Sequence, residues 1–147
     1  MGQYVRAFFS SPLLPALVLS RRETENIAVE MLKSLGLEHY GLNIIFNSDS
    51  AMDNLNRRFL SCTGPANVLA FPDSFRKETG LLGEIFISVQ ALRREPVLYG
   101  QQPFDHFILL LGHGILHLTG TDHGPEMEAL GDKLQQSVSP ETYTIKT

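Results

Sequence analysis

Three of the five histidines lie close together near the C-terminal end of the chain: His113, His117 and His123. His113 and His117 are four residues apart, so on a helix their imidazoles share one face, one turn apart. Gly120 follows, and a glycine there can take the left-handed conformation that ends a helix and reverses the chain toward His123. Three neutral imidazoles with a fourth position open to water form a catalytic zinc site. We therefore predict that these histidines bind Zn²⁺.

Two other interpretations of the histidines stay open. A single histidine on an apolar helix is most often a hydrogen-bonded core residue, and a pair spaced by four can be two such residues. A purely structural zinc site normally takes four protein ligands rich in cysteine, whereas this chain has one cysteine, Cys62. The full spacing H-x-x-x-H-x-x-G-x-x-H favours a catalytic site, in which the metal lowers the pKa of its water to about 7 and polarises a substrate oxygen.

The same spacing is that of the metzincin peptidases, apart from one position. Those enzymes carry a glutamate directly after the first histidine, and this glutamate is the general base. The corresponding residue here is Gly114, which cannot accept a proton. A metallopeptidase is therefore a disfavoured alternative, open only if a base comes from elsewhere in the fold.

The histidine segment HGILHLTGTDH (113–123) resembles the signature HGxLHLxGyDH of the YbeY family of metal-dependent bacterial endoribonucleases. Three upstream segments resemble that family in the same order: LNRRF (55–59), PANVLAFP (65–72) and LLGEIFIS (81–88). The resemblance covers about residues 20–135. It implies an α+β fold, with an about four-stranded mixed sheet, helices packed on it and the three-histidine metal site in a cleft. It also implies a cytoplasmic, zinc-dependent single-strand endoribonuclease acting in ribosomal RNA maturation and ribosome quality control.

Three further residues are candidates for catalysis: Arg57, Arg58 and Asp122. We expect one of the two arginines to position the RNA backbone. Asp122 stands beside the third histidine and can accept a hydrogen bond from a ligand imidazole, which would fix its tautomer. The alternative for Asp122 is a turn residue after Gly120. The partners that the resemblance implies are single-stranded or ribosomal RNA, and a ribosomal protein or an assembly GTPase.

The chain departs from the family pattern at Leu60. The family carries an arginine associated with activity at this place, and leucine can neither bind a phosphate nor stabilise charge in a transition state. This departure leaves a second function open, a metal-containing protein of ribosome assembly that docks without cutting. Glu84 is a milder departure, since the family usually has aspartate there. As it lies inside an apolar strand, its carboxylate either faces solvent or points into the cleft.

The composition is that of one ordinary globular domain over residues 1–147, with 43% hydrophobic and 19% charged residues. The net charge of −4 excludes a surface that attracts nucleic acid everywhere, so an RNA enzyme needs a local basic patch. The basic side chains that could converge on a cleft are Arg57, Arg58, Arg76, Lys77, Arg93 and Arg94. The apolar run at 7–19 contains two prolines and is too short to span a bilayer, so we expect no membrane association.

Hydrophobic periodicity and breaker residues predict strands at residues 3–9, 40–47, 68–71 and 82–88. Helices are predicted at residues 21–35, about 49–59, 89–98, 104–118 and 125–136. Pro96 is expected to end or kink the third of these helices. The fourth helix is the most apolar, and we expect it to be buried on most faces, with His106 at its solvent end.

Overall fold

The structure is a computed structural model that describes residues 4–10, 19–60, 66–121 and 124–138. Its four strands are β1 (Val5–Phe9), β2 (Gly41–Asn47), β3 (Val68–Pro72) and β4 (Leu81–Ser88). The helices are α1 (Arg21–Ser34), α2 (Asp49–Leu60), α3 (Arg76–Thr79), α4 (Val89–Tyr99), α5 (Pro103–Leu118) and α6 (Pro125–Ser137). Each predicted strand and helix is therefore present, with ends within a few residues of the predicted ones.

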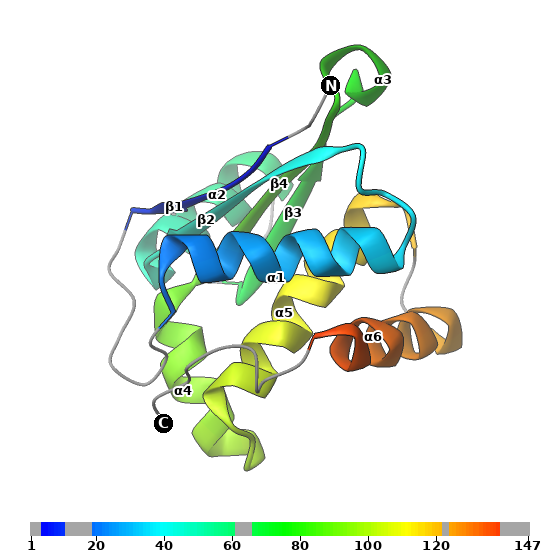
Figure 1. Cartoon of the computed structure of the whole chain (residues 1–147). Coiled ribbons are helices and arrows are strands. Elements are labelled where there is room, and N and C mark those ends of the chain that lie inside the picture. The colour runs from blue at the N-terminus through cyan, green and yellow to red at the C-terminus, as the bar shows by residue number, and fades with distance from the viewer. Residues whose placement is uncertain (1–3, 11–18, 61–65, 122–123, 139–147) are drawn as a thin grey trace.

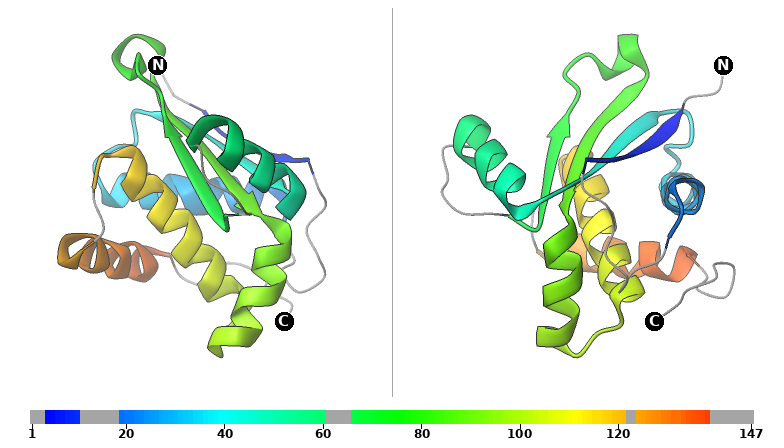
Figure 2. Two further views of the ribbon diagram at one scale, coloured as in Figure 1. Left: turned by 180° about the vertical axis from the view of Figure 1, so that it is seen from behind. Right: turned by 90° about the vertical axis from the view of Figure 1, so that its left-hand side faces the viewer.

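The four strands form one mixed sheet in the order β1-β2-β4-β3. β1, β2 and β4 run parallel, whereas β3 is the edge strand and pairs with β4 in antiparallel orientation. Figure 1 shows α1 and α5 on one face of this sheet, with α6 packed against both of them. α2 lies on the opposite face (Figure 2). This arrangement confirms the predicted α+β fold with a four-stranded mixed sheet.

The hydrophobic core lies between the sheet and the helices α1 and α5. Its fully buried side chains include Ile27, Met31, Leu42, Ile44, Phe46, Ile85, Ile87, Phe107, Leu111 and Ile115. β4 alternates, so that Ile85 and Ile87 face this core while Glu84 and Phe86 face the side of α2. The predicted burial of α5 on most faces is confirmed, because eleven of its sixteen residues are buried. α5 is thus held rigidly by its surroundings.

Local capping explains where the first helix begins. Ser20 accepts a hydrogen bond from the backbone N–H of Glu23 at 3.0 Å, and the Glu23 carboxylate accepts one from the Ser20 N–H at 3.0 Å. This reciprocal capping box satisfies two N–H groups that have no partner inside the helix. No described helix combines the length and the hydropathy that crossing a bilayer would need.

At the contact between α4 and α5, α4 runs past Pro96 to Tyr99, within one residue of the predicted end, and Gly100 takes the left-handed conformation that closes its last turn. One prediction at this contact was wrong. His106 is not at a solvent end but is 3% exposed, because α4 covers the first turns of α5. Its two ring nitrogens lie 2.7 Å from a Glu95 carboxylate oxygen and 2.8 Å from the Gln101 side-chain oxygen.

Asp49, at the start of α2, accepts hydrogen bonds from the Ser88 hydroxyl at 2.6 Å and from the Arg94 guanidinium at 2.9 Å. Partial burial raises the pKa of the Asp49 carboxyl, but the hydrogen bonds from Arg94 and Ser88 outweigh it and hold this pKa below its ordinary 3.8. A carboxyl whose pKa is lower in the folded state than in the unfolded state stabilises the fold at pH values above the unfolded pKa. That stabilisation is lost as the pH falls through the folded pKa.

We therefore expect Asp49→Asn to lower the free energy of unfolding at pH 7 and to lower it less at pH 3. Urea denaturation of both proteins at the two pH values measures the difference. An equal loss at pH 7 and pH 3 would contradict the role of the Asp49 charge.

Candidate active site

His113 and His117 lie on the last two turns of α5, as the spacing predicts. Both side chains are half-buried, whereas Gly112, Gly114 and Leu116 around them are buried. A separation of four residues places the two residues about 6 Å apart along the helix axis. The two histidines therefore occupy one partly open stripe on a helix that is otherwise enclosed.

The chain reverses direction directly after this pair. Gly120 has φ of +86°, and its N–H donates to the carbonyl of His117 at 3.1 Å. The N–H of Thr121 donates to the carbonyl of Leu116, also at 3.1 Å. This is the Schellman pattern, which needs a left-handed residue and so favours glycine. The predicted role of Gly120 is confirmed, while Asp122 and His123 lie outside the described residues.

The chemistry of the two described histidines fits zinc. Imidazole nitrogen is a preferred zinc ligand, and two rings one turn apart can contact one ion. The site is also at the C-terminal end of α5, where the helix dipole is negative and favours a cation. The described residues contain no group of three potential metal ligands. The third predicted ligand, His123, is not among the described residues. Zinc binding therefore stays a prediction.

Gly114 has a packing role that the sequence did not reveal. A Cβ atom at this position would lie 2.9 Å from Cγ2 and 3.0 Å from Cδ1 of Ile85 on β4. Ile85 is fully buried, so it has little room to move. The glycine lets α5 lie close against the sheet, and a glutamate side chain has no space there. The glutamate that a metzincin-type peptidase carries at this position would press its Cβ atom against Ile85.

Arg76 reaches the C-terminal end of α5 from the connection between β3 and β4. Its Nη1 donates to the carbonyl of Leu118 at 3.1 Å, one residue after His117. The bond satisfies one of the carbonyls that a helix end leaves without a partner. Arg76 therefore places a positive charge close to the histidine pair. This is the position that a residue of the predicted basic patch would need.

Three of the other predicted basic residues, Arg57, Arg58 and Arg94, lie elsewhere. Arg57 forms an ion pair with Asp53 on the same helix at 3.1 Å, and Arg58 lies over the ring of Phe59 at 5.5 Å. Both are exposed on α2, which packs on the face of β4 opposite to α5. Arg94 is paired with Asp49. The structure therefore brings Arg76 to the end of α5 but does not bring Arg57 and Arg58 to that face of the sheet.

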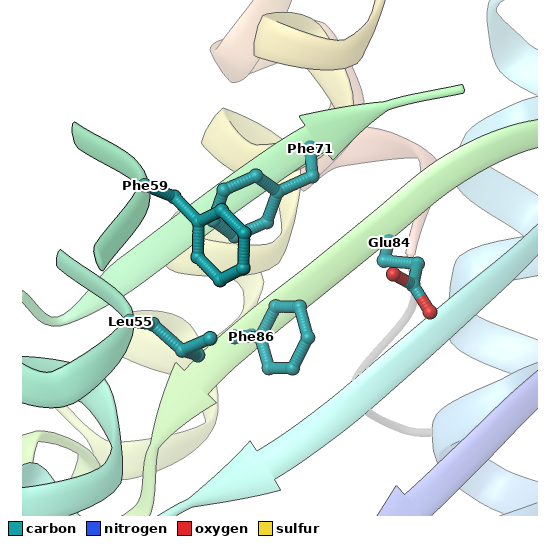
Figure 3. Close-up of a pocket in the computed structure, with 5 residues that line it drawn as sticks. All are labelled: Leu55, Phe59, Phe71, Glu84 and Phe86. Atoms are coloured by element: carbon teal, nitrogen blue, oxygen red, sulfur yellow. The ribbon is translucent and has the colours of Figure 1, made fainter. Parts of the chain in front are cut away.

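A cavity of about 330 Å³ opens between α2 and the sheet (Figure 3). The residues that line it are Leu55, Phe59, Phe71, Glu84 and Phe86. Two orientations of Glu84 were compatible with the sequence, and the structure places this residue in the wall of the cavity. The sequence did not predict that Phe59, Phe71 and Phe86 would line one cavity, because they come from three separate elements. The aromatic residues within the LNRRF, NVLAF and LLGEIF segments were the signal that could have indicated them.

A sequence profile of the family described as Endoribonuclease YbeY matches residues 18–138. The chain belongs to the YbeY family. Endoribonuclease YbeY of Oleidesulfovibrio alaskensis is 37% identical over 139 residues, covering 80% of this chain and 82% of that protein. The namesake from Nitratidesulfovibrio vulgaris is 33% identical over 139 residues, covering 82% and 86%. The solution structure of a Thermotoga maritima protein is similar with a TM-score of 0.64 and 20% identity, covering 90% of this chain and 87% of that one.

Membership of the YbeY family confirms the family named from the sequence motifs, and with it the endoribonuclease class of enzyme. The matched residues include the histidine segment and all three upstream segments. The Thermotoga maritima structure supports the fold. Zinc and the site residues stay predictions.

Proposed function

We propose that this chain is a zinc-dependent endoribonuclease that cuts single-stranded RNA during ribosomal RNA maturation and ribosome quality control in the cytoplasm. One observation carries the proposal: His113 and His117 form a partly open pair on α5, directly before the reversal at Gly120. His123, the third proposed ligand, follows this reversal three residues later in the sequence. A ribosomal protein or an assembly GTPase is the proposed protein partner.

Four residues have proposed roles in this reaction. His113 and His117 hold the ion on a rigid helix, and Asp122 accepts a hydrogen bond from a ligand imidazole and so fixes its tautomer. Arg76 brings a positive charge toward the approaching phosphate, which offsets the net negative charge of the chain. When bound, zinc supplies Lewis-acid chemistry at the phosphorus.

The proposed function is tested by measuring metal content and RNA cleavage on the same preparation. The expected result is about one zinc per chain and cleavage of a single-stranded RNA that stops on treatment with a chelator and returns with zinc. Purified protein that cuts RNA equally well after complete removal of zinc would overturn the role of the metal. Protein with zinc and no cleavage would favour the second candidate function.

The second candidate is a ribosome-assembly protein that binds without cutting, and the observation that favours it is Leu60. If the missing arginine limits activity, Leu60→Arg should raise the rate of RNA cleavage by about tenfold or more, since a charged hydrogen bond contributes about 1.5–3 kcal/mol. Single-turnover cleavage by both proteins measures this gain. Leu60→Met is the matched control, because it changes the side chain without adding charge. Efficient cleavage by the natural sequence would exclude the second candidate.

A further inference from the structure

The cavity between α2 and the sheet contains an arrangement that the proposed chemistry at the histidines does not use. The rings of Phe71 and Phe86 lie 5.6 Å apart and nearly perpendicular, and Phe59 and Phe71 lie 5.7 Å apart at a similar angle. Phe59 is 59% exposed at the mouth of the cavity. An aromatic side chain left open beside an apolar cavity is typical of a binding surface. Its size is at the low end for ligand pockets, which suits one flat ring.

The charges around the cavity suit a nucleotide. Glu84 is the one charged residue among the described residues that line it. At the end of α2, Arg57 and Arg58 are exposed, and Arg58 lies over the Phe59 ring. A phosphate backbone passing over these arginines would place a base above Phe59. Unpaired RNA bases are recognised in this way, by stacking on aromatic rings and by hydrogen bonds to their edges.

The cavity also lies near the histidine pair, across the edge strand. A Cβ atom at Gly83 would lie 2.4 Å from the carbonyl oxygen of Phe71 and 2.7 Å from Cδ2 of Leu118. The backbone of a cavity residue and the helix end that carries His117 therefore meet at the same point of β4. β3 is the edge of the sheet, so one RNA strand can cross it and reach both places.

We propose that this cavity binds one unpaired base of the RNA substrate, stacked on Phe59 with its edge toward Glu84. The inference rests on the proposed function, because it names how the same RNA is recognised. A carboxylate only accepts hydrogen bonds, so it prefers a base that offers adjacent donors. Guanine offers N1–H and the N2 amino group side by side, whereas the N3–H of uracil lies between two acceptor oxygens that repel a carboxylate. The cavity therefore selects guanine over uracil.

The test compares two labelled pentaribonucleotides, one of five uridines and one with guanosine at the centre. Fluorescence anisotropy on the zinc-loaded full chain measures their dissociation constants. The guanosine probe is expected to bind about tenfold more tightly than the uridine probe. Phe59→Ala should weaken binding of the guanosine probe by about tenfold, as loss of one base–aromatic stack does. Phe75→Ala is the matched control, since Phe75 is equally open at 68% exposure but lies outside the cavity.

Glu84→Gln is the second variant, because it keeps the shape of the side chain and adds a donor. It should remove the preference for guanosine, because it weakens binding of the guanosine probe and strengthens binding of the uridine probe, whose carbonyl oxygens no longer face a carboxylate. Thermal unfolding of all variants verifies that the fold is kept. Equal binding of the two probes by the natural sequence, or equal effects of Phe59→Ala and Phe75→Ala, would overturn the proposal. The cavity would then be interpreted as a binding site for an apolar side chain of a protein partner.

Cleavage measured in parallel separates this inference from the proposed function. Zinc-dependent cleavage that is unaffected by Phe59→Ala and Glu84→Gln would support the enzyme and overturn the base pocket. Binding that favours guanosine and depends on Phe59, without any cleavage, would support the pocket and overturn the enzyme.

Discussion

Replacing His117 with alanine is expected to remove zinc from the purified protein and to abolish RNA cleavage. The side chain is one of two imidazoles on the same stripe of α5, and the site has three proposed ligands. Losing one of three ligands should weaken zinc binding by more than about a hundredfold, since even loss of a group that only supports a ligand costs 10- to 100-fold. Metal analysis after dialysis, followed by a single-turnover cleavage assay, measures both effects.

His39→Ala is the matched control for this prediction. His39 is exposed and far along the chain from α5, and its ring lies at a tilted angle to that of Tyr40, with ring centroids 4.3 Å apart. It should keep both zinc and cleavage. A His117→Ala protein that retains stoichiometric zinc would show that the histidines were assigned to the wrong role.

Replacing Gly114 with glutamate is expected to destabilise the protein by more than about 3 kcal/mol. Even alanine there adds a Cβ atom 2.9 Å from a buried Ile85 methyl group. Overpacking of this kind typically costs about 1–3 kcal/mol, more than the roughly 1 kcal/mol that alanine gains over glycine in a helix. Glutamate adds the cost of a carboxylate pressed against an apolar sheet. Urea denaturation of Gly114→Ala and Gly114→Glu measures both costs.

Gly131→Ala in α6 is the matched control, because no atom lies within 4 Å of its added Cβ. Its unfolding free energy should rise by about 0.5–1 kcal/mol from helix propensity alone. Combining Gly114→Ala with Ile85→Ala tests the contact directly, because alanine removes all three of the Ile85 atoms that the added Cβ would meet, and the pair should lose less stability than the sum of the single variants. Gly114→Ala that stabilises the protein as Gly131→Ala does would contradict the close packing. It would also reopen the space that a peptidase base requires.

Sequence patterns predicted the features that depend on neighbours along the chain. The placement of His113 and His117 on one helix face and the reversal at Gly120 are both confirmed. Each depends on spacings of three or four residues, which the geometry of a helix turns directly into contacts. The motif segments also identified the family, because their order and spacing are specific.

Predictions that depended on which elements meet were less successful. His106 was expected at a solvent end, but α4 folds over it and supplies Glu95 as a partner. Arg57 and Arg58 were two of the basic residues that could have converged on a cleft with the histidines, and α2 carries them on the face of β4 opposite to α5. The sequence gives no distance between segments that are far apart along the chain, so neither outcome could be read from spacing.

The sequence by itself therefore determined the helix that carries the histidine pair, the glycine that turns the chain after it, and the family. Tertiary structure alone decided that Gly114 is a packing residue, that Arg76 reaches the end of α5, and that three phenylalanines enclose a cavity. The physical reason is the strand order β1-β2-β4-β3. It places β4 inside the sheet, with α5 on one face and α2 on the other, and this depends on pairing between distant segments.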